Sequence, residues 1–204
     1  MLDRTVSPPV SKGGGNPSAS LHRFEVASID LRNRALRSIW NIVWLLLFRP
    51  SPRIFHGWRV ALLRLFGAQI ASPAYIYPSA RVWAPWNLSM QAHSTLADGV
   101  NCYCVDKIMI GAYTTVSQYT HLCTATHDYS APLRPDHPEM PLLTAPIRLG
   151  DRVWVTADVF VAPGVHIGDG GVALARSVVL SDIQPWTVVS GNPAVYRKTR
   201  TIRA

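Results

Sequence analysis

Aliphatic residues recur at every sixth position through much of the chain, and this spacing constrains the fold more than any other feature. A period of six matches neither the 3.6-residue period of a helix nor the alternation of long strands in hairpins. It matches a solenoid whose coil has three flat sides, each built from one hexapeptide with an aliphatic side chain pointing into a narrow prism. The longest run is Leu149, Val155, Val161, Ile167, Ala173 and Val179, and the positions four residues further on hold Val153, Val159, Val165, Gly171, Ser177 and Ile183. We therefore predict an all-β solenoid of five or six coils over residues 67–190.

The same spacing can be followed, with a gap, in the earlier part of the chain. Glycine in Leu149-Gly150-Asp151 and Ile167-Gly168-Asp169 is expected to accept backbone angles at the turns that other residues avoid. The earlier run is Ile70, Ile76, Val82 and Leu88 with Ala74, Ala80 and Ala92 at the companion positions, and Ile110, Val116 and Leu122 resume it after an irregular stretch.

The repeat is interrupted between residues 126 and 147, where prolines and polar residues replace it. The coils on either side can stack only if this segment leaves the prism, so we predict an extruded loop over residues 128–146. Long loops on rigid scaffolds commonly serve a binding or catalytic site. His127 stands at the junction between coil and loop.

The segment before the repeat has a different amino-acid composition. Residues 1–20 are rich in glycine, proline and serine and are expected to be disordered. Residues 21–66 are expected to be helical, basic and aromatic, with an apolar run over residues 39–48 that is too short to cross a membrane. Two interpretations stay open: this helix packs over the open end of the solenoid, or it lies at an anionic membrane surface with Trp40 and Trp44 at headgroup depth.

The net charge of +8 is concentrated in two places. Clusters of this kind favour phosphates, either on a cofactor or on lipid headgroups, or they are ordinary solvated surface. No zinc-finger, RNA-binding or helix-turn-helix signature accompanies them, which argues against nucleic acid. One cluster is Arg23, Arg32, Arg34, Arg37, Arg49, Arg53, Arg59 and Arg64, and the other is Arg197, Lys198, Arg200 and Arg203 in a basic tail over residues 191–204.

Three cysteines, Cys102, Cys104 and Cys123, form no regular disulfide or zinc pattern. They are typical of a reduced interior. The start of the chain lacks the continuous apolar region of a signal peptide. A cytoplasmic location is therefore expected, with peripheral contact at the inner face of the membrane if residues 21–66 bind lipid.

Four short motifs carry a family resemblance over residues 38–197. They are the Thr124-Ala125-Thr126-His127 ending before the loop, the His127-Asp128-Tyr129 that follows, the Gly191-Asn192-Pro193-Ala194 finish and the Phe48-Arg49-Pro50-Ser51-Pro52 segment. With the hexapeptide repeat, they resemble the hexapeptide-repeat acyltransferases, and among these most of all the colanic acid and exopolysaccharide biosynthesis O-acetyltransferases. The resemblance implies a left-handed parallel β-helix, a homotrimer with active sites in grooves between subunits, and acetyl-CoA as co-substrate without a metal.

His127 matches the catalytic histidine of that family at the start of the extruded loop. Transfer of an acetyl group to a hydroxyl needs a base that works near neutral pH, and histidine has a suitable pKa. No comparable argument applies to His22, His56, His93, His137 and His166.

His121 is a competitor, because it lies six residues before His127 and is expected at the same hexapeptide position on the adjoining side of the prism. The γ-class carbonic anhydrases are a related β-helix group that binds a metal through histidines. Here only His93 is available as a third ligand. A metal hydratase of that kind, or a non-catalytic β-helix scaffold, is the alternative function.

The resemblance also assigns residues to the two substrates. Trp154 matches a residue that borders the pantetheine channel, and Ala157 and Ala175 match positions whose backbone contacts the pantetheine arm. Backbone N–H groups of this kind, here that of Ala157, can stabilise a developing oxyanion. Arg176 and Arg197 are candidates for the phosphates.

The acceptor is expected to be a sugar hydroxyl, on a lipid-linked glycan if the basic segment binds membrane. Asn101 and Asp106 are candidates to hold it, and Asp106 is equally expected to cap a turn.

Overall fold

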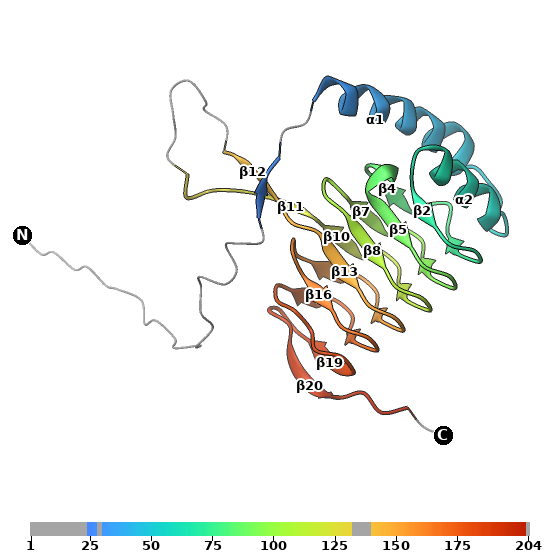
Figure 1. Ribbon diagram of the computed structural model, residues 1–204. Helices are drawn as coiled ribbons and strands as arrows, with labels where there is room; N and C mark the ends of the chain where they lie inside the picture. The colour runs from blue at the N-terminus through green and yellow to red at the C-terminus, as the bar shows by residue number, and fades with distance from the viewer. Residues whose placement is uncertain (1–23, 28–29, 132–139, 203–204) are drawn as a thin grey trace, which may run out of the picture.

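The chain forms a parallel β-solenoid capped at one end by helices (Figure 1), so the predicted fold class is confirmed. The computed structural model describes residues 24–27, 30–131 and 140–202. The predicted disorder of residues 1–20 lies outside the described residues. Each coil passes through three sheets in turn, and strands of successive coils pair in parallel within each sheet.

We call the three sheets the first, second and third face, in chain order. The first face contains β2 (Gln69–Ile70), β5 (Leu88–Met90), β8 (Ile108–Ile110), β13 (Ile147–Leu149) and β16 (His166–Ile167). The second contains β3 (Tyr75–Ile76), β6 (Thr95–Leu96), β9 (Thr115–Val116), β14 (Trp154–Val155), β17 (Val172–Ala173), β19 (Thr187–Ser190) and the antiparallel β20 (Val195–Thr199). The third contains β4 (Arg81–Val82), β7 (Asn101–Tyr103), β10 (His121–Cys123), β15 (Phe160–Val161) and β18 (Val178–Val179).

The predicted inward positions form the core. Every residue of the run from Leu149 to Val179 is buried, and so are the companions from Val153 to Ile183. Removing these aliphatic side chains from water is the main driving force for coiling, at about 25 cal/mol for each Å² of apolar surface buried.

The irregular stretch of the repeat is explained by coil length. Ile70 pairs with Met90 and Met90 with Ile110, twenty residues apart, whereas Leu149 pairs with Ile167, eighteen apart. The two extra residues of each early coil lie at the edge between the third and first faces, which we call the loop edge. Ala92 is therefore not an inward companion as predicted: it is half-buried, and Ser94 occupies the interior instead.

The loop edge is where chain leaves the prism. In the first coil it carries the short 3₁₀-helix η4 (Pro85–Asn87). In the third coil it releases a hairpin of β11 (Ala125–His127) and β12 (Leu142–Thr144), which pair antiparallel, and β1 (Glu25–Val26) adds a third strand against β12. Residues 132–139 at the tip lie outside the described residues.

The helical segment closes the end of the solenoid that holds β2, β3 and β4 (Figure 1). Helix α1 (Leu31–Val43) runs into a π-helical turn η3 (Trp44–Phe48), and α2 (His56–Leu65) follows. Trp40, Trp44 and Phe48 are four residues apart and buried; the indole N–H groups of Trp40 and Trp44 donate to the carbonyls of Val82 (2.7 Å) and Ala80 (2.9 Å). The prediction that these tryptophans lie at headgroup depth is wrong, because they bond to the first coil.

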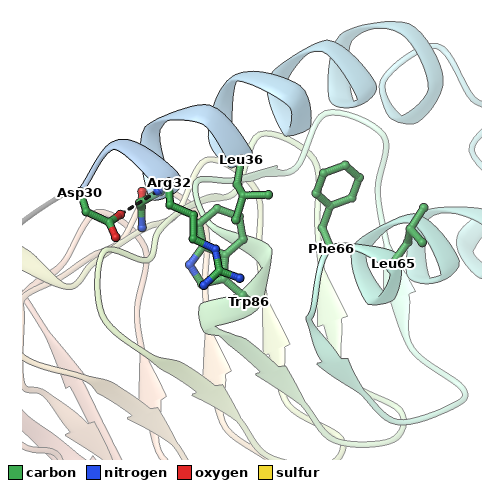
Figure 2. Close-up of a pocket in the computed structure, with 7 residues that line it drawn as sticks. Asp30, Arg32, Leu36, Leu65, Phe66 and Trp86 are labelled. Carbon is green, nitrogen blue, oxygen red and sulfur yellow. Dashed lines mark hydrogen bonds between the residues drawn. The ribbon is translucent and has the colours of Figure 1, made fainter.

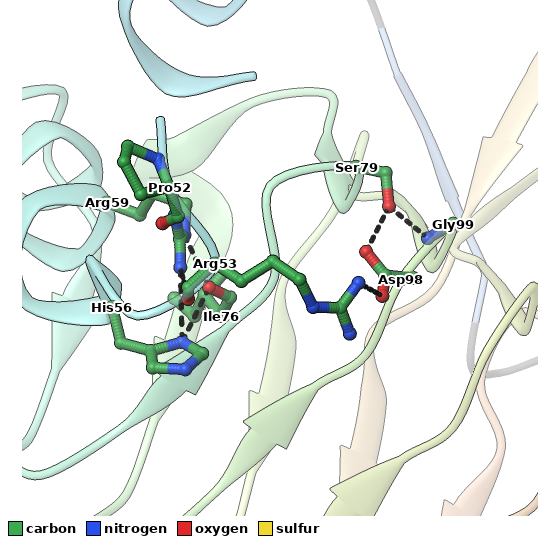
Figure 3. A network of polar contacts seen from close by, with 8 residues as sticks. All are labelled: Pro52, Arg53, His56, Arg59, Ile76, Ser79, Asp98 and Gly99. Carbon is green, nitrogen blue, oxygen red and sulfur yellow. Dashed lines mark hydrogen bonds and ion pairs between the residues drawn. The ribbon is translucent and has the colours of Figure 1, made fainter. Parts of the chain in front are cut away.

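Several arginines of the predicted phosphate-binding cluster are used internally. Arg59 is fully buried, and its guanidinium donates to the carbonyls of Ile76, Pro52 and Arg53 (Figure 3). Arg53 pairs with Asp98 at 2.7 Å, and Arg37 lies 3.9 Å from the ring centre of Trp83. These side chains fasten the cap to the solenoid.

Gly150 and Gly168 were expected to adopt backbone angles that other residues avoid, but the structure shows a different reason for glycine at these turns. Gly150 and Gly168 do not have positive φ angles. The positive φ angles of these turns are at Arg152 and Gly170. Instead, a Cβ on Gly150 would lie 2.2 Å from Asp169 Oδ1 and 2.9 Å from its backbone nitrogen. Glycine is needed here because successive turns stack closely.

Replacing Gly150 with alanine is expected to lower the free energy of unfolding by about 1–3 kcal/mol, as in other overpacked sites. Gly57→Ala in α2 is the matched control, since a Cβ there meets nothing within 4 Å and alanine favours a helix. In denaturant titrations, the unfolding midpoint should fall for Gly150→Ala and rise for Gly57→Ala. Equal stability of Gly150→Ala and the wild type would contradict this account.

Candidate functional site

His127 is the last residue of β11 and is exposed at the base of the hairpin. Its Nδ1 lies 3.0 Å from the carbonyl oxygen of Met140 on the returning side of the loop. A carbonyl only accepts, so Nδ1 carries the proton in this bond and the neutral ring has its lone pair on Nε2. The hairpin thus both presents the ring to solvent and fixes the tautomer that a base needs.

His121 does not occupy an equivalent position, and that expectation is wrong. It lies on the third face in β10, whereas β11 has already left the prism to pair antiparallel with β12. The His121 Nδ1 lies 3.4 Å from the amide nitrogen of Asn101, and its ring packs near Phe160. Partial burial lowers the pKa of His121, which favours the neutral ring.

The two predicted acceptor residues have different surroundings. Asn101 is half-buried on the third face beside His121. Asp106 lies at the loop edge, where its Oδ1 accepts from the backbone N–H of Lys107 at 2.6 Å. Its own N–H donates to Thr124 Oγ1 at 2.9 Å, three residues before His127. Asp106 therefore caps a turn next to the departure point of the hairpin.

The predicted pantetheine residues lie on the second face and at its edge with the third face. The ring of Trp154 in β14 is exposed, and its N–H donates to Ser117 Oγ at 3.0 Å. Ala157 and Ala175 occupy stacked turns at the second–third edge, where the N–H of Arg176 donates to the Ala157 carbonyl at 3.0 Å. An exposed aromatic ring beside open turn backbone suits an extended chain of amides and methylenes.

The candidate phosphate ligands are partly engaged. Arg176 forms an exposed ion pair with Asp158 at 3.4 Å, and Arg197 Nε donates to Ser190 Oγ at 2.6 Å. Sequence reasoning did not single out Arg152 and Arg200 as cofactor residues. They line a hollow of about 540 Å³ with Trp154, and Arg200 donates to the carbonyl of Arg152 at 2.8 Å. These two cations beside the predicted channel suit anionic groups.

One chain does not bring His127 and the pantetheine residues together along a single edge. His127 emerges at the loop edge, whereas Ala157 and Ala175 lie at the second–third edge, so the width of the third face separates them. A side of five residues spans roughly 15 Å.

A second hollow, of about 530 Å³, lies between α1, the end of α2 and η4 at the loop edge (Figure 2). Phe66 and Trp86 supply aromatic walls, and Asp30 and Arg32 supply charged groups at its rim. Aromatic walls with a polar rim are suited to a ring that bears hydroxyls.

The ligand set of the metal hydratase alternative is not assembled. Across residues 24–27, 30–131 and 140–202, no three His, Cys, Asp or Glu side chains gather as a metal site. His93 stacks on Tyr113, with ring centres 4.7 Å apart, and does not join His121. In the same described ranges, no helix is long and apolar enough to cross a membrane.

Comparisons with known proteins agree with the fold. No protein-family model matches the chain. The chain is 40% identical over 162 residues to WcaF of Escherichia coli (strain K12), described as a colanic acid biosynthesis acetyltransferase, and the match covers 79% of this chain and 86% of that protein.

Two solved structures share the fold along most of both chains. A hexapeptide-repeat acetyltransferase of Vibrio cholerae O1 biovar eltor, complexed with acetyl coenzyme A, superposes with a TM-score of 0.74 and 25% identity over 85% of this chain and 91% of that one. A maltose O-acetyltransferase of Clostridium difficile 630 gives a TM-score of 0.74 and 26% identity over 85% and 90%.

Proposed function

The chain belongs to the hexapeptide-repeat acetyltransferase family of the Escherichia coli colanic acid enzyme, and from that membership we propose that it acetylates a sugar hydroxyl, with His127 as general base, in the synthesis of an exopolysaccharide or other surface glycan. It is an acetyl-CoA-dependent acetyltransferase with a left-handed β-helix. The observation that carries the residue assignment is the bond from His127 Nδ1 to the Met140 carbonyl, which leaves Nε2 as an exposed base.

The proposed reaction is a direct transfer. Bound acetyl-CoA supplies the acetyl group as a thioester. Nε2 of His127 takes the proton of the acceptor hydroxyl as that oxygen bonds to the thioester carbonyl carbon and the carbon–sulfur bond breaks. The imidazolium then gives the proton to the departing sulfur, so the products are an ester and CoA with a free thiol, and the enzyme is unchanged.

The separation of His127 from Ala157 within one chain supports a site shared between copies. A neighbouring copy that places its second–third edge against the loop edge would bring Trp154 and Ala157 to His127. A cyclic homotrimer repeats one such contact three times and closes. Arg152, Arg176, Arg197 and Arg200 are the cations that this arrangement offers to the phosphates of CoA.

The acceptor is proposed from the relatives and from the loop edge. WcaF is described by its role in colanic acid biosynthesis and one solved neighbour is a maltose O-acetyltransferase, so a sugar is the acceptor class. Asp106 and the hollow beside Trp86 lie at the loop edge, and Asn101 lies on the third face beside His121. The acceptor hydroxyl would approach His127 from that side.

The test is acetyl transfer to a panel of soluble oligosaccharides with acetyl-CoA, followed by mass spectrometry of the sugar and a thiol assay for CoA. We expect one acetyl ester per CoA released, on a subset of the sugars. CoA should also raise the thermal midpoint, because it binds the folded state. Acetylation of amines alone, or thiol release without any sugar ester, would overturn the proposal.

A further inference from the structure

The outer surface of the helical cap is apolar and exposed. The side of α1 and η3 that packs on the first coil carries Trp40, Trp44 and Phe48, and the other side carries apolar residues that none of the residues described by the structure covers. We call this surface the cap face. Its exposed members are Ile39, Ile42, Leu45, Leu46, Leu47, Ile54, Phe55, Trp58 and Leu65. Exposed apolar side chains gathered in this number on one segment mark an interaction site.

The spacing shows that the cap face is a single stripe. Ala35, Ile39, Ile42, Leu46 and Arg49 follow one another at intervals of three or four residues, which places them on one side of a helix. They lie opposite the buried stripe. The neighbouring helix adds an aromatic part: residues of η3 and the start of α2 line a shallow hollow there, and the indole N–H of Trp58 donates to the Leu47 carbonyl at 3.0 Å while the ring stays exposed.

Between the α1 cap residue Asp30 and Asp98, the charges around the cap face have one sign. Residues 31–97 contain no aspartate or glutamate, and residues 31–66 contain seven arginines. Five of these, Arg37, Arg49, Arg53, Arg59 and Arg64, make contacts within the chain, that of Arg49 being with the ring of Trp44 at 5.5 Å. Arg32 and Arg34 in the first turns of α1 and Arg49 at the end of η3 are exposed at the two ends of the apolar stripe.

We propose that the cap face docks on the surface of an anionic lipid bilayer, with its apolar side chains at the acyl boundary and Arg34 and Arg49 at the lipid phosphates. Apolar residues between cations, with an exposed tryptophan, are the composition of an interfacial helix. A second copy is a poorer occupant, because a symmetric contact would set arginines against arginines with no acid from this segment to offset them.

Docking would decide which acceptor the enzyme meets, a step that rests on the proposed function. The strand β10 that leads to His127 is the third of its face from the cap, after β4 and β7. Two strand spacings are about 10 Å, and the thickness of α1 between the first coil and the cap face adds about 10 Å. A hydroxyl on a lipid-linked glycan, a short distance outside the headgroups, is therefore at the depth of His127.

The experiment is co-sedimentation with vesicles of phosphatidylglycerol mixed with phosphatidylcholine, and with vesicles of phosphatidylcholine alone. The wild type should bind the anionic vesicles and lose binding as salt rises. Ile42→Glu, at a side chain 58% exposed, should weaken binding at least tenfold. Ile202→Glu is the matched control: Ile202 is 69% exposed and follows β20, the strand of the second face farthest from the cap, so this variant should bind vesicles as the wild type does. The double variant Arg34→Ala/Arg49→Ala should bind anionic vesicles more weakly, by about fivefold in affinity for each arginine removed.

Two outcomes would overturn the inference. One is binding that Ile42→Glu and Ile202→Glu alter equally. The other is light scattering that shows self-association of the wild type abolished by Ile42→Glu, which would make a second copy the occupant. Acetyl transfer to a soluble sugar by Ile42→Glu should match the wild type. A wild type that binds vesicles but acetylates no sugar would contradict the proposed function alone.

Discussion

Replacing His127 with alanine is expected to lower kcat for acetyl transfer by about 10²–10⁴-fold, the range that a positioned general base contributes. The loss should be in the chemical step, because no group at this position would then take the hydroxyl proton. His127 is exposed and its ring contacts only the Met140 carbonyl among the bonds described, so the fold should be unaffected. Steady-state release of CoA thiol with a fixed sugar acceptor measures the effect.

His166→Ala is the matched control for that experiment. His166 is an exposed histidine on a strand of the first face, and its removal should leave kcat within twofold or so of the wild type, as for ordinary surface positions. The stabilisation of His127→Ala by CoA should also equal that of the wild type. If His127→Ala turned over normally, the base would have to be another group, and His121 with its bond to Asn101 would be tested next.

The part of the fold that could be predicted from sequence is the part that repeats. Between Leu149 and Val179 each hexapeptide buries its aliphatic residue and the companion four residues further on, so local spacing alone determines which residues are buried. The early coils were harder to predict because Leu88 and Met90 both point inward on one strand. Leu88 continues the six-residue count from Val82, so the sequence hides the two-residue extension that begins there.

The sequence predicts those features of the site that follow from local sequence. It does not predict those that depend on contacts with residues far away along the chain. His127 could be located because the repeat stops beside it. Its orientation could not, because that follows from pairing with β12, which lies beyond the loop. Arg152 and Arg200 were missed as a pair because the antiparallel return of β20 brings the tail back to the solenoid.

The cap was ambiguous for a related reason. In the apolar run over residues 39–48, two opposite sides of one helix are both hydrophobic, so periodicity cannot indicate which side faces the solenoid. The hydrogen bonds of the Trp40 and Trp44 indoles to first-coil carbonyls settle that point.

Replacing Arg59 with methionine is expected to lower the free energy of unfolding by about 1–3 kcal/mol, the cost of leaving buried hydrogen-bond acceptors without their donor. Methionine fills a similar volume but donates no hydrogen bond, so the carbonyls of Ile76, Pro52 and Arg53 would lose a charged donor in a buried place. Burial lowers the pKa of Arg59, yet a guanidinium stays protonated at any pH where the fold is tested.

Denaturant titration at a fixed protein concentration measures this loss, with Arg34→Met as the control at an exposed arginine of the same segment. The control should change stability by no more than about 0.5 kcal/mol. Arg59→Lys separates charge from geometry, because lysine keeps the positive charge but reaches fewer of the carbonyls. Its free energy of unfolding should therefore lie between those of the wild type and Arg59→Met. Because Arg59 connects the turn after η3 to the first coil, the same variant should also expose the end of the solenoid, and hydrogen exchange should rise first at Ile76. A variant Arg59→Met as stable as Arg34→Met would show that packing of Trp40, Trp44 and Phe48 alone holds the cap.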